Sequence, residues 1–134
     1  MKINVLLFDS DISSVAMVQD IDYKCTIPSL DSRTNEDVLI AGKRVLNEKL
    51  NLDCDIKLNF LSSEAGSQLT HEGTRVINET NLYGMIDSKY EGMLFDKVVW
   101  VKVPYVINMS TDNIEMLRTY YNILLAHKIL SHHE

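Results

Sequence analysis

The chain has 134 residues, of which 46% are hydrophobic and 24% charged, and its net charge of −6 comes from 13 basic and 19 acidic residues. These values are typical of one globular domain, so we expect residues 1–134 to fold as a single domain and exclude a disordered or fibrous chain. The acidic balance argues against duplex nucleic acid as the main partner, because neutralising phosphates requires a basic surface.

The cysteines and the lengths of the apolar runs indicate where in the cell the protein is expected to be. Cys25 and Cys54 have neither the spacing of metal ligands nor that of a redox pair, so we expect reduced thiols. The apolar run at the N-terminus is too short for a signal-peptide core, and no stretch approaches the ~20 apolar residues of a membrane span. We therefore expect a cytoplasmic protein without membrane contact.

The first elements predicted along the chain are two strands. INVLLF at residues 3–8 is a continuous apolar run of the kind found in buried strands. Turn-forming residues occupy 9–14, and a second short strand follows at 15–18, so the two strands are expected to form a hairpin. Residues 20–33 then indicate a loop.

A helix over residues 34–50 is the next predicted element. Thr34 and Asp37 resemble a capping box at its start, and Asn51 is suited to end it. Apolar residues recur at helical spacing and predict one buried face, formed by Val38, Leu39, Ala41, Val45, Leu46 and Leu50.

Further strands are expected in the second half of the chain. Residues 56–61 indicate a strand, 62–75 are polar and indicate a long loop or hairpin connection, and 76–86 fit a strand less clearly. The strongest strand pattern is KVVWVKVPYVI at 97–107, where Pro104 places the far end at an edge or a bulge.

A C-terminal helix completes the series. Ser110 or Thr111 is expected to cap it, and an apolar stripe predicts its buried face, formed by Ile114, Leu117, Tyr121, Leu124 and Leu125. The element order β-β-α-β-(β)-β-α predicts the fold class, an α/β sandwich in which helices cover a mixed sheet on both sides.

Charged and aliphatic residues around the first helix form an ordered pattern. Glu36 is followed after seven residues by Arg44, and Leu46, Glu48 and Leu52 stand at offsets of two, four and eight from that arginine. This pattern resembles the Nudix box, G-x5-E-x7-R-E-U-x-E-E-x-G-U with U an aliphatic residue. Five of its nine defined positions are filled.

Residues around the box extend the resemblance. Pro28-Ser29-Leu30 stands where many Nudix proteins carry Pro-Gly-Gly, and Ala41 lies three residues before the arginine, where the family often has alanine. The element order is similar over nearly the whole chain. The resemblance implies a Nudix-like α/β/α sandwich and hydrolysis of a diphosphate linked to another group, by water that Mg²⁺ or Mn²⁺ activates.

The departures from the box concern the metal ligands. Positions 45, 48 and 49 share one helix face, and the family pattern has glutamate at all three. This chain has Val45, Glu48 and Lys49. Valine binds no metal and lysine repels one, so the remaining glutamate is a weak site for a cation that prefers several oxygen ligands.

Our leading hypothesis is a Nudix-like domain that binds a nucleotide or nucleoside-diphosphate derivative with weak or no hydrolysis, in a sensing, sequestering or regulatory role. Arg44 and Lys49 would hold phosphate directly in place of a metal. Asn108 and Asn113 flank the start of the last helix, where the resemblance implies contacts to the ligand's ring. Arg44 and Glu48 also have a purely structural interpretation, as a solvated i,i+4 ion pair.

Two alternatives stay open. The first is an active divalent-metal-dependent pyrophosphohydrolase with relocated carboxylates, in which Glu48 and Glu36 are catalytic, Glu48 binds the metal, and Glu91 or Asp96 assists. The second is a protein-interaction module on the same scaffold. The sequence singles out no interface for a homodimer or a protein partner.

Overall fold

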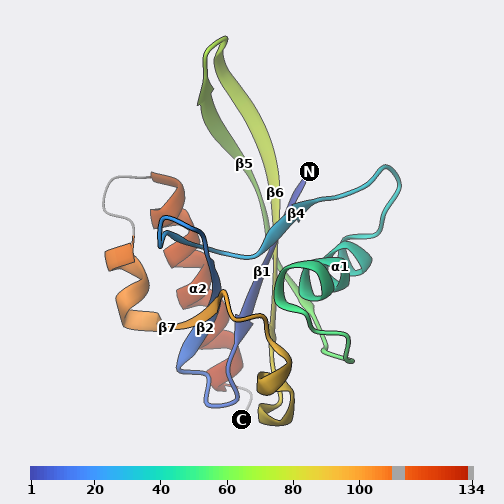
Figure 1. Cartoon of the computed structure of the whole chain (residues 1–134). Coiled ribbons are helices and arrows are strands. Elements are labelled where there is room, and N and C mark those ends of the chain that lie inside the picture. The colour runs from blue at the N-terminus through green and yellow to red at the C-terminus, as the bar shows by residue number, and fades with distance from the viewer. Residues whose placement is uncertain (110–113, 133–134) are drawn as a thin grey trace.

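The computed structural model describes residues 1–109 and 114–132, with the backbone alone at residues 66–70, 75, 77, 108, 109 and 114–116. In this part of the chain seven strands form one sheet (Figure 1). The strands are β1 (Lys2–Phe8), β2 (Ser14–Gln19), β3 (Cys25–Thr26), β4 (Ser29–Asp31), β5 (Asn59–Thr70), β6 (Gly73–Met85) and β7 (Val98–Lys102). The helices are α1 (Val38–Leu50) and α2 (Ile114–His132), with 3-10 helices η1 (Ser88–Met93) and η2 (Val103–Met109).

Strand β1 is the centre of the sheet. It runs parallel to β6 along its whole length, from Lys2 opposite Glu79 to Phe8 opposite Met85. On its other edge it pairs antiparallel with β4 at the start and with β2 at the end, so the sheet is mixed. A strand covered on both faces needs a continuous apolar run, which is why residues 3–8 predicted it. The first two strands and their antiparallel pairing are confirmed.

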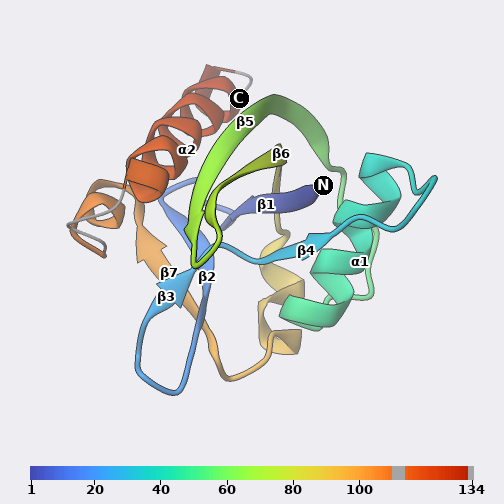
Figure 2. The same ribbon diagram turned by 90° about the horizontal axis from the view of Figure 1, so that it is seen from above.

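The sheet separates two apolar cores. Ile3, Val5 and Leu7 of β1 point to α1, whereas Leu6 and Phe8 point to α2, because successive side chains of a strand face opposite sides. Figure 2 shows α1 and α2 on opposite sides of the sheet. The predicted α/β sandwich is therefore confirmed.

Helix α1 begins later than predicted. Asp37, not Thr34, is its N-cap, and the Asp37 carboxylate accepts a hydrogen bond of 2.8 Å from the Leu39 amide. Asn35 has a φ of 63°, a left-handed conformation that cannot belong to the helix. Leu39 was expected on the buried face but is 41% exposed, since it follows the cap on the outer side of the first turn.

The polar middle of the chain folds as strands instead of a loop. Residues 62–75 were predicted as a long loop or hairpin connection, yet β5 runs from Asn59 to Thr70 and pairs antiparallel with β6. The register shifts once, between Phe60 and Ser62, and the pairing continues to Thr70 opposite Gly73. Gly73 has a φ of 122°, which fits the tight turn between them. Main-chain hydrogen bonds to a partner strand outweigh the weak propensity of Ser and Gly here. The loop predicted at 20–33 likewise contains the short strands β3 and β4.

The last predicted strand is shorter than its sequence pattern. β7 pairs with β2 and ends at Lys102, after which residues 103–109 form η2. Pro104 has no amide hydrogen for a ladder, which explains why the strand stops before it. The expected caps Ser110 and Thr111 lie outside the described residues.

The prediction for the buried face of α2 is wrong. Four residues of the predicted stripe are exposed, with fractions of 43% for Leu117, 63% for Tyr121, 36% for Leu124 and 46% for Leu125. The side chain of Ile114 lies outside the described part. The helix instead buries Asn122, Ile123 and Ala126. None of the described helices is long and apolar enough to cross a membrane.

Candidate functional site

Arg44 lies at the centre of a set of polar contacts on one flank of α1. Its Nε donates to Glu36 Oε2 and its Nη2 to Glu36 Oε1, both at 3.1 Å. Nη2 also donates to the Asp31 carbonyl oxygen at 2.7 Å, and the Arg33 amide donates to Glu36 Oε1 at 2.9 Å. These bonds fasten the segment before α1 onto the helix, since they join residues that lie 8 and 13 positions apart.

The pair changes the acidity of both partners. Hydrogen bonds from Arg44 and then from the Arg33 amide hold the pKa of Glu36 below its usual value. The Glu36 carboxylate in turn raises the pKa of Arg44. Both groups therefore stay charged around neutral pH, and Glu36 is a poor proton acceptor.

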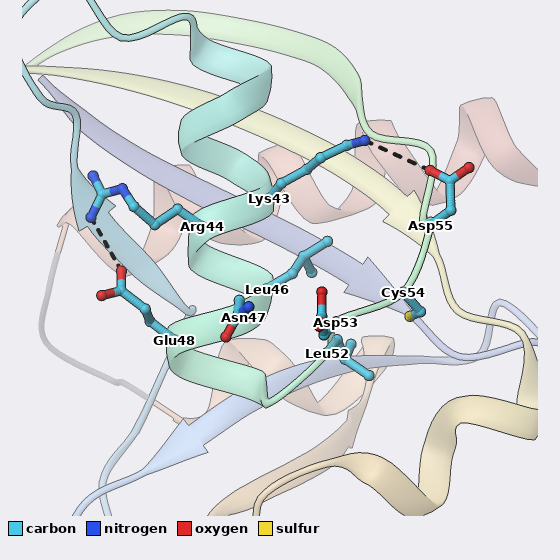
Figure 3. Close-up of a pocket in the computed structure, with 9 residues that line it drawn as sticks. All are labelled: Lys43, Arg44, Leu46, Asn47, Glu48, Leu52, Asp53, Cys54 and Asp55. Carbon is cyan, nitrogen blue, oxygen red and sulfur yellow. Dashed lines mark hydrogen bonds and ion pairs between the residues drawn. The ribbon is translucent and has the colours of Figure 1, made fainter.

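Glu48 completes the cluster from the solvent side. Arg44 Nη1 donates to Glu48 Oε2 at 3.2 Å, an i,i+4 pair (Figure 3) in which the glutamate side chain is 49% exposed. An exposed pair of this kind contributes only a few tenths of a kcal/mol. The structural interpretation of Arg44 and Glu48 as a surface ion pair thus fits the geometry.

Positions 45 and 49 lie on the stripe of α1 that faces the sheet. The Val45 side chain is fully buried in the core beneath α1. Lys49 follows one turn later and is half-buried, and it makes no hydrogen bond or ion pair with the residues that the structure describes. An apolar group and a cation therefore occupy the two positions at which the box pattern has carboxylates.

The described residues do not fit the expected Mg²⁺ or Mn²⁺ site. They contain no group of three or more His, Cys, Asp or Glu side chains close enough to share a metal. Glu36 is held by Arg44, and Glu48 stands beside the same guanidinium. Mg²⁺ needs several oxygen ligands in a near-octahedral shell. One exposed carboxylate next to an arginine does not supply that shell.

The other predicted site residues lie on later segments of the chain. Glu91 lies in η1, and Asp96 is exposed in the turn that follows it. Neither belongs to a metal-binding group within the described part. The side chain of Asn108 and all of Asn113 lie outside the described residues.

A groove of about 690 Å³ opens on the exposed side of α1, between the helix and the segment at 52–55 (Figure 3). Lys43 on the helix faces Asp55 across it at 3.7 Å. Cys54 lines it as well, and burial followed by the charge of Asp53 raises the pKa of that thiol. The groove therefore combines charges of both signs with a protonated thiol, and it contains neither Val45 nor Lys49.

A polar network that the sequence did not reveal crosses the core on the α2 side. Asn4 donates to Asn81 at 3.0 Å, Asn81 to Ser62 at 3.1 Å, and Ser62 to Asn122 at 3.0 Å. Asn122 then donates to Glu64 Oε1 at 2.9 Å. The signal that could have found it is a set of Asn and Ser residues at inward positions of strands, where apolar residues are the rule.

No protein-family model and no curated protein sequence matches the chain. Solved structures do match. A candidate Nudix hydrolase from Listeria monocytogenes has a TM-score of 0.71 at 16% identity, over 99% of this chain and 95% of that chain. The dihydroneopterin triphosphate pyrophosphohydrolase of E. coli has a TM-score of 0.71 at 15% identity, over 91% and 90%. The Nudix domain of Shewanella oneidensis NrtR, in complex with ADP ribose, has a TM-score of 0.64 at 15% identity, over 90% and 83%.

Proposed function

The chain has the Nudix fold, and we propose that it uses this fold to bind a nucleotide or nucleoside-diphosphate derivative without efficient hydrolysis. A structural neighbour, the NrtR Nudix domain, was solved with ADP ribose. Such a protein would act as a sensor, a sequestering protein or a regulatory subunit.

The main support for this proposal is that Val45 and Lys49 occupy positions at which the box pattern has glutamate. A fully buried valine removes one ligand, and a half-buried lysine supplies a positive charge on the same stripe one turn away. In the box pattern a cation bound to carboxylates neutralises the diphosphate. Here the ammonium group of Lys49 would neutralise it directly, with no metal required.

The two cations suggested by the sequence take different parts in the proposal. Arg44 already donates to Glu36, Glu48 and the Asp31 carbonyl, so we assign it mainly to positioning the segment before α1. Lys49 has no such partner among the described residues and is the better phosphate ligand. Asn108 and Asn113 remain our proposal for contacts to the ring of the ligand.

Calorimetric titration tests the binding proposal. ADP-ribose, nucleoside triphosphates and dinucleotide polyphosphates are each titrated in EDTA and again in Mg²⁺. We expect at least one of them to bind in EDTA, and Lys49→Glu to weaken that binding by at least ~10-fold, since the charge at the phosphate reverses. The matched control is Lys43→Glu, because Lys43 lies on the same helix but faces Asp55. Absence of binding without metal, or an equal loss in both variants, would exclude this role for Lys49.

An active pyrophosphohydrolase is the second candidate, favoured by the fold match to the dihydroneopterin triphosphate enzyme. In that case Glu48 would bind the metal and act with Glu36, and Glu91 or Asp96 would assist. Release of phosphate products in Mg²⁺ or Mn²⁺ that disappears in Glu48→Gln would establish it. Product release that Glu48→Gln leaves unchanged would rule out this mechanism.

A further inference from the structure

The outer side of α2 is unusually apolar for the surface of a folded domain. Leu117, Tyr121, Leu124 and Leu125, which we call the α2 face, are all exposed. They recur at helical spacing on the side turned away from Ile123, which is fully buried. A surface helix normally carries polar residues on that side, and a helix that is apolar all round is normally buried.

A recess continues the α2 face toward η2. It has a volume of about 440 Å³, and Leu124 belongs both to its wall and to the α2 face. The main lining side chains are Ile12, Val103, Pro104, Tyr120, Leu124 and His127.

The exposed apolar area approaches what a stable pair of proteins buries. The α2 face leaves roughly 380 Å² uncovered per copy, at about 200 Å² for a large side chain. Two copies together would bury roughly 750 Å² from these residues alone, before the rim is counted, and a specific interface needs about 1,200–2,000 Å² in total.

Charge favours a second copy of this chain as the occupant. Two copies that each carry −6 repel one another, so they associate best through a face without acidic groups. The sequence has no Asp or Glu from residue 117 to 132, and Lys128 is the one Lys or Arg among the exposed residues of this stretch. An apolar, nearly uncharged face is self-complementary, as the single surface of a two-fold dimer must be.

We propose that the α2 face is the interface of a two-fold dimer. The helices of the two copies pack against one another through Leu117, Tyr121 and Leu124. Tyr121 is the most exposed of the four residues, and the recess beside Leu124 offers space for a side chain of the other copy. Aromatic side chains that enter such pockets commonly dominate binding energy.

Sedimentation equilibrium of the full chain tests this interface. Wild type is expected to form dimers within roughly 1 µM to 1 mM. Tyr121→Glu is expected to raise the dimer dissociation constant by at least ~10-fold, because it places a charge in an apolar interface. Ile40→Glu is the matched control, since Ile40 is 61% exposed on α1, and it should leave the constant unchanged.

Three results would overturn the proposal. They are a wild-type monomer at every concentration, a dimer that Tyr121→Glu leaves intact, and a dimer that Ile40→Glu weakens equally. Far-UV circular dichroism of both variants checks that each is folded. The outcome is independent of the nucleotide titrations, which concern α1 on the opposite side of the sheet.

Discussion

Arg44 and Glu36 meet in a two-point contact, in which two guanidinium nitrogens each donate to a separate carboxylate oxygen at 3.1 Å. Side-chain exposures of 18% and 9% keep the pair largely from solvent. This geometry gives both strength and orientation, because a planar fork meets a planar acceptor. The contact therefore fixes the path of the chain into α1.

Removal of the charge at Glu36 should change how stability depends on pH. The pKa of Glu36 is lowered in the folded protein, so the pair contributes stability at neutral pH and loses it as pH falls below about 4.5, the ordinary glutamate value. Glu36→Gln should lower the melting temperature at pH 7 and have less effect near pH 3. Thermal unfolding of wild type and Glu36→Gln across pH 3–7 measures the difference in melting temperature at each pH.

Glu48→Gln is the control for this prediction. Glu48 contacts the same arginine through one bond and is half exposed, so its loss should matter much less at pH 7. If the two substitutions lower the melting temperature at pH 7 equally, the two-point contact between Arg44 and Glu36 is not the main source of that stability.

Restoring a glutamate at position 45 should destabilise the protein without creating an active hydrolase. Val45 is fully buried, and a carboxylate there would be desolvated in an apolar core, at a cost of about 3 kcal/mol. Lys49 lies four residues on, but an ion pair in that core does not recover its desolvation energy. Urea unfolding and a Mg²⁺-dependent phosphate-release assay of Val45→Glu test the two parts. A stable variant with gained turnover would contradict the prediction.

Replacing Asn51 at the C-terminal end of α1 should destabilise the protein. It has a φ of 63°, its amide donates to the Asn47 carbonyl, and the Leu52 amide donates to the Leu46 carbonyl, which closes the helix. Its side-chain Nδ2 also donates to the Met93 carbonyl at 2.9 Å. Asn51→Ala should cost about 1–2 kcal/mol, because alanine disfavours the left-handed conformation.

Asn51→Gly separates the two contributions of this residue. Glycine keeps the backbone conformation and loses only the bond to Met93, so its cost should be smaller than that of alanine. Chemical denaturation of both variants gives the difference. A glycine variant less stable than the alanine variant would contradict the prediction, because both variants lose the bond to Met93 and only alanine is strained in the left-handed conformation.

Gly84 and Gly92 should differ in their tolerance of alanine. A Cβ at Gly84 would stand 2.8 Å from the Lys57 carbonyl oxygen, a backbone atom that cannot easily move. Gly84→Ala should therefore cost about 2 kcal/mol, or roughly 6 °C in melting temperature. Gly92→Ala is the control, since nothing lies within 4 Å of its Cβ position. Differential scanning calorimetry should find that variant within ~0.5 kcal/mol of wild type.

The sequence predicted those parts of the fold where one local signal dominates. The apolar run at residues 3–8 fits only a strand covered on both faces, and Asn51 is one of the few residues that tolerate the left-handed end of a helix. The spacing of Glu36 and Arg44 indicated a motif. That the two residues form a two-point contact depends on where the preceding segment lies, which a helical pattern does not contain.

The orientation of α2 could not be predicted from its sequence. Leu117, Tyr121 and Leu124 recur at helical spacing, but so do Ile123, Ala126 and Leu130 on the opposite side. Two apolar stripes on one helix give no basis for deciding which one faces the sheet. The η2 segment and Asn122 decide it in the structure, through partners distant in sequence.

A negative charge introduced at position 122 tests the buried hydrogen-bond network that joins the sheet to α2. The Asn122 amide donates to Glu64 and accepts from the Ser62 hydroxyl. Asn122→Asp removes the donor and places a second carboxylate beside Glu64, so we expect a loss of about 2–3 kcal/mol at pH 7.

Glu64→Gln in the Asn122→Asp background gives the matched rescue. The glutamine amide can donate to the new aspartate, which restores one donor and one acceptor with the directions exchanged. We expect the double variant to recover more than half of the stability lost at pH 7, as urea unfolding would measure. If the loss in the double variant equals the sum of the losses in Asn122→Asp and Glu64→Gln alone, Glu64 and Asn122 do not interact in the folded protein. Rescue in the double variant would show that the loss in Asn122→Asp comes from the contact between these two side chains.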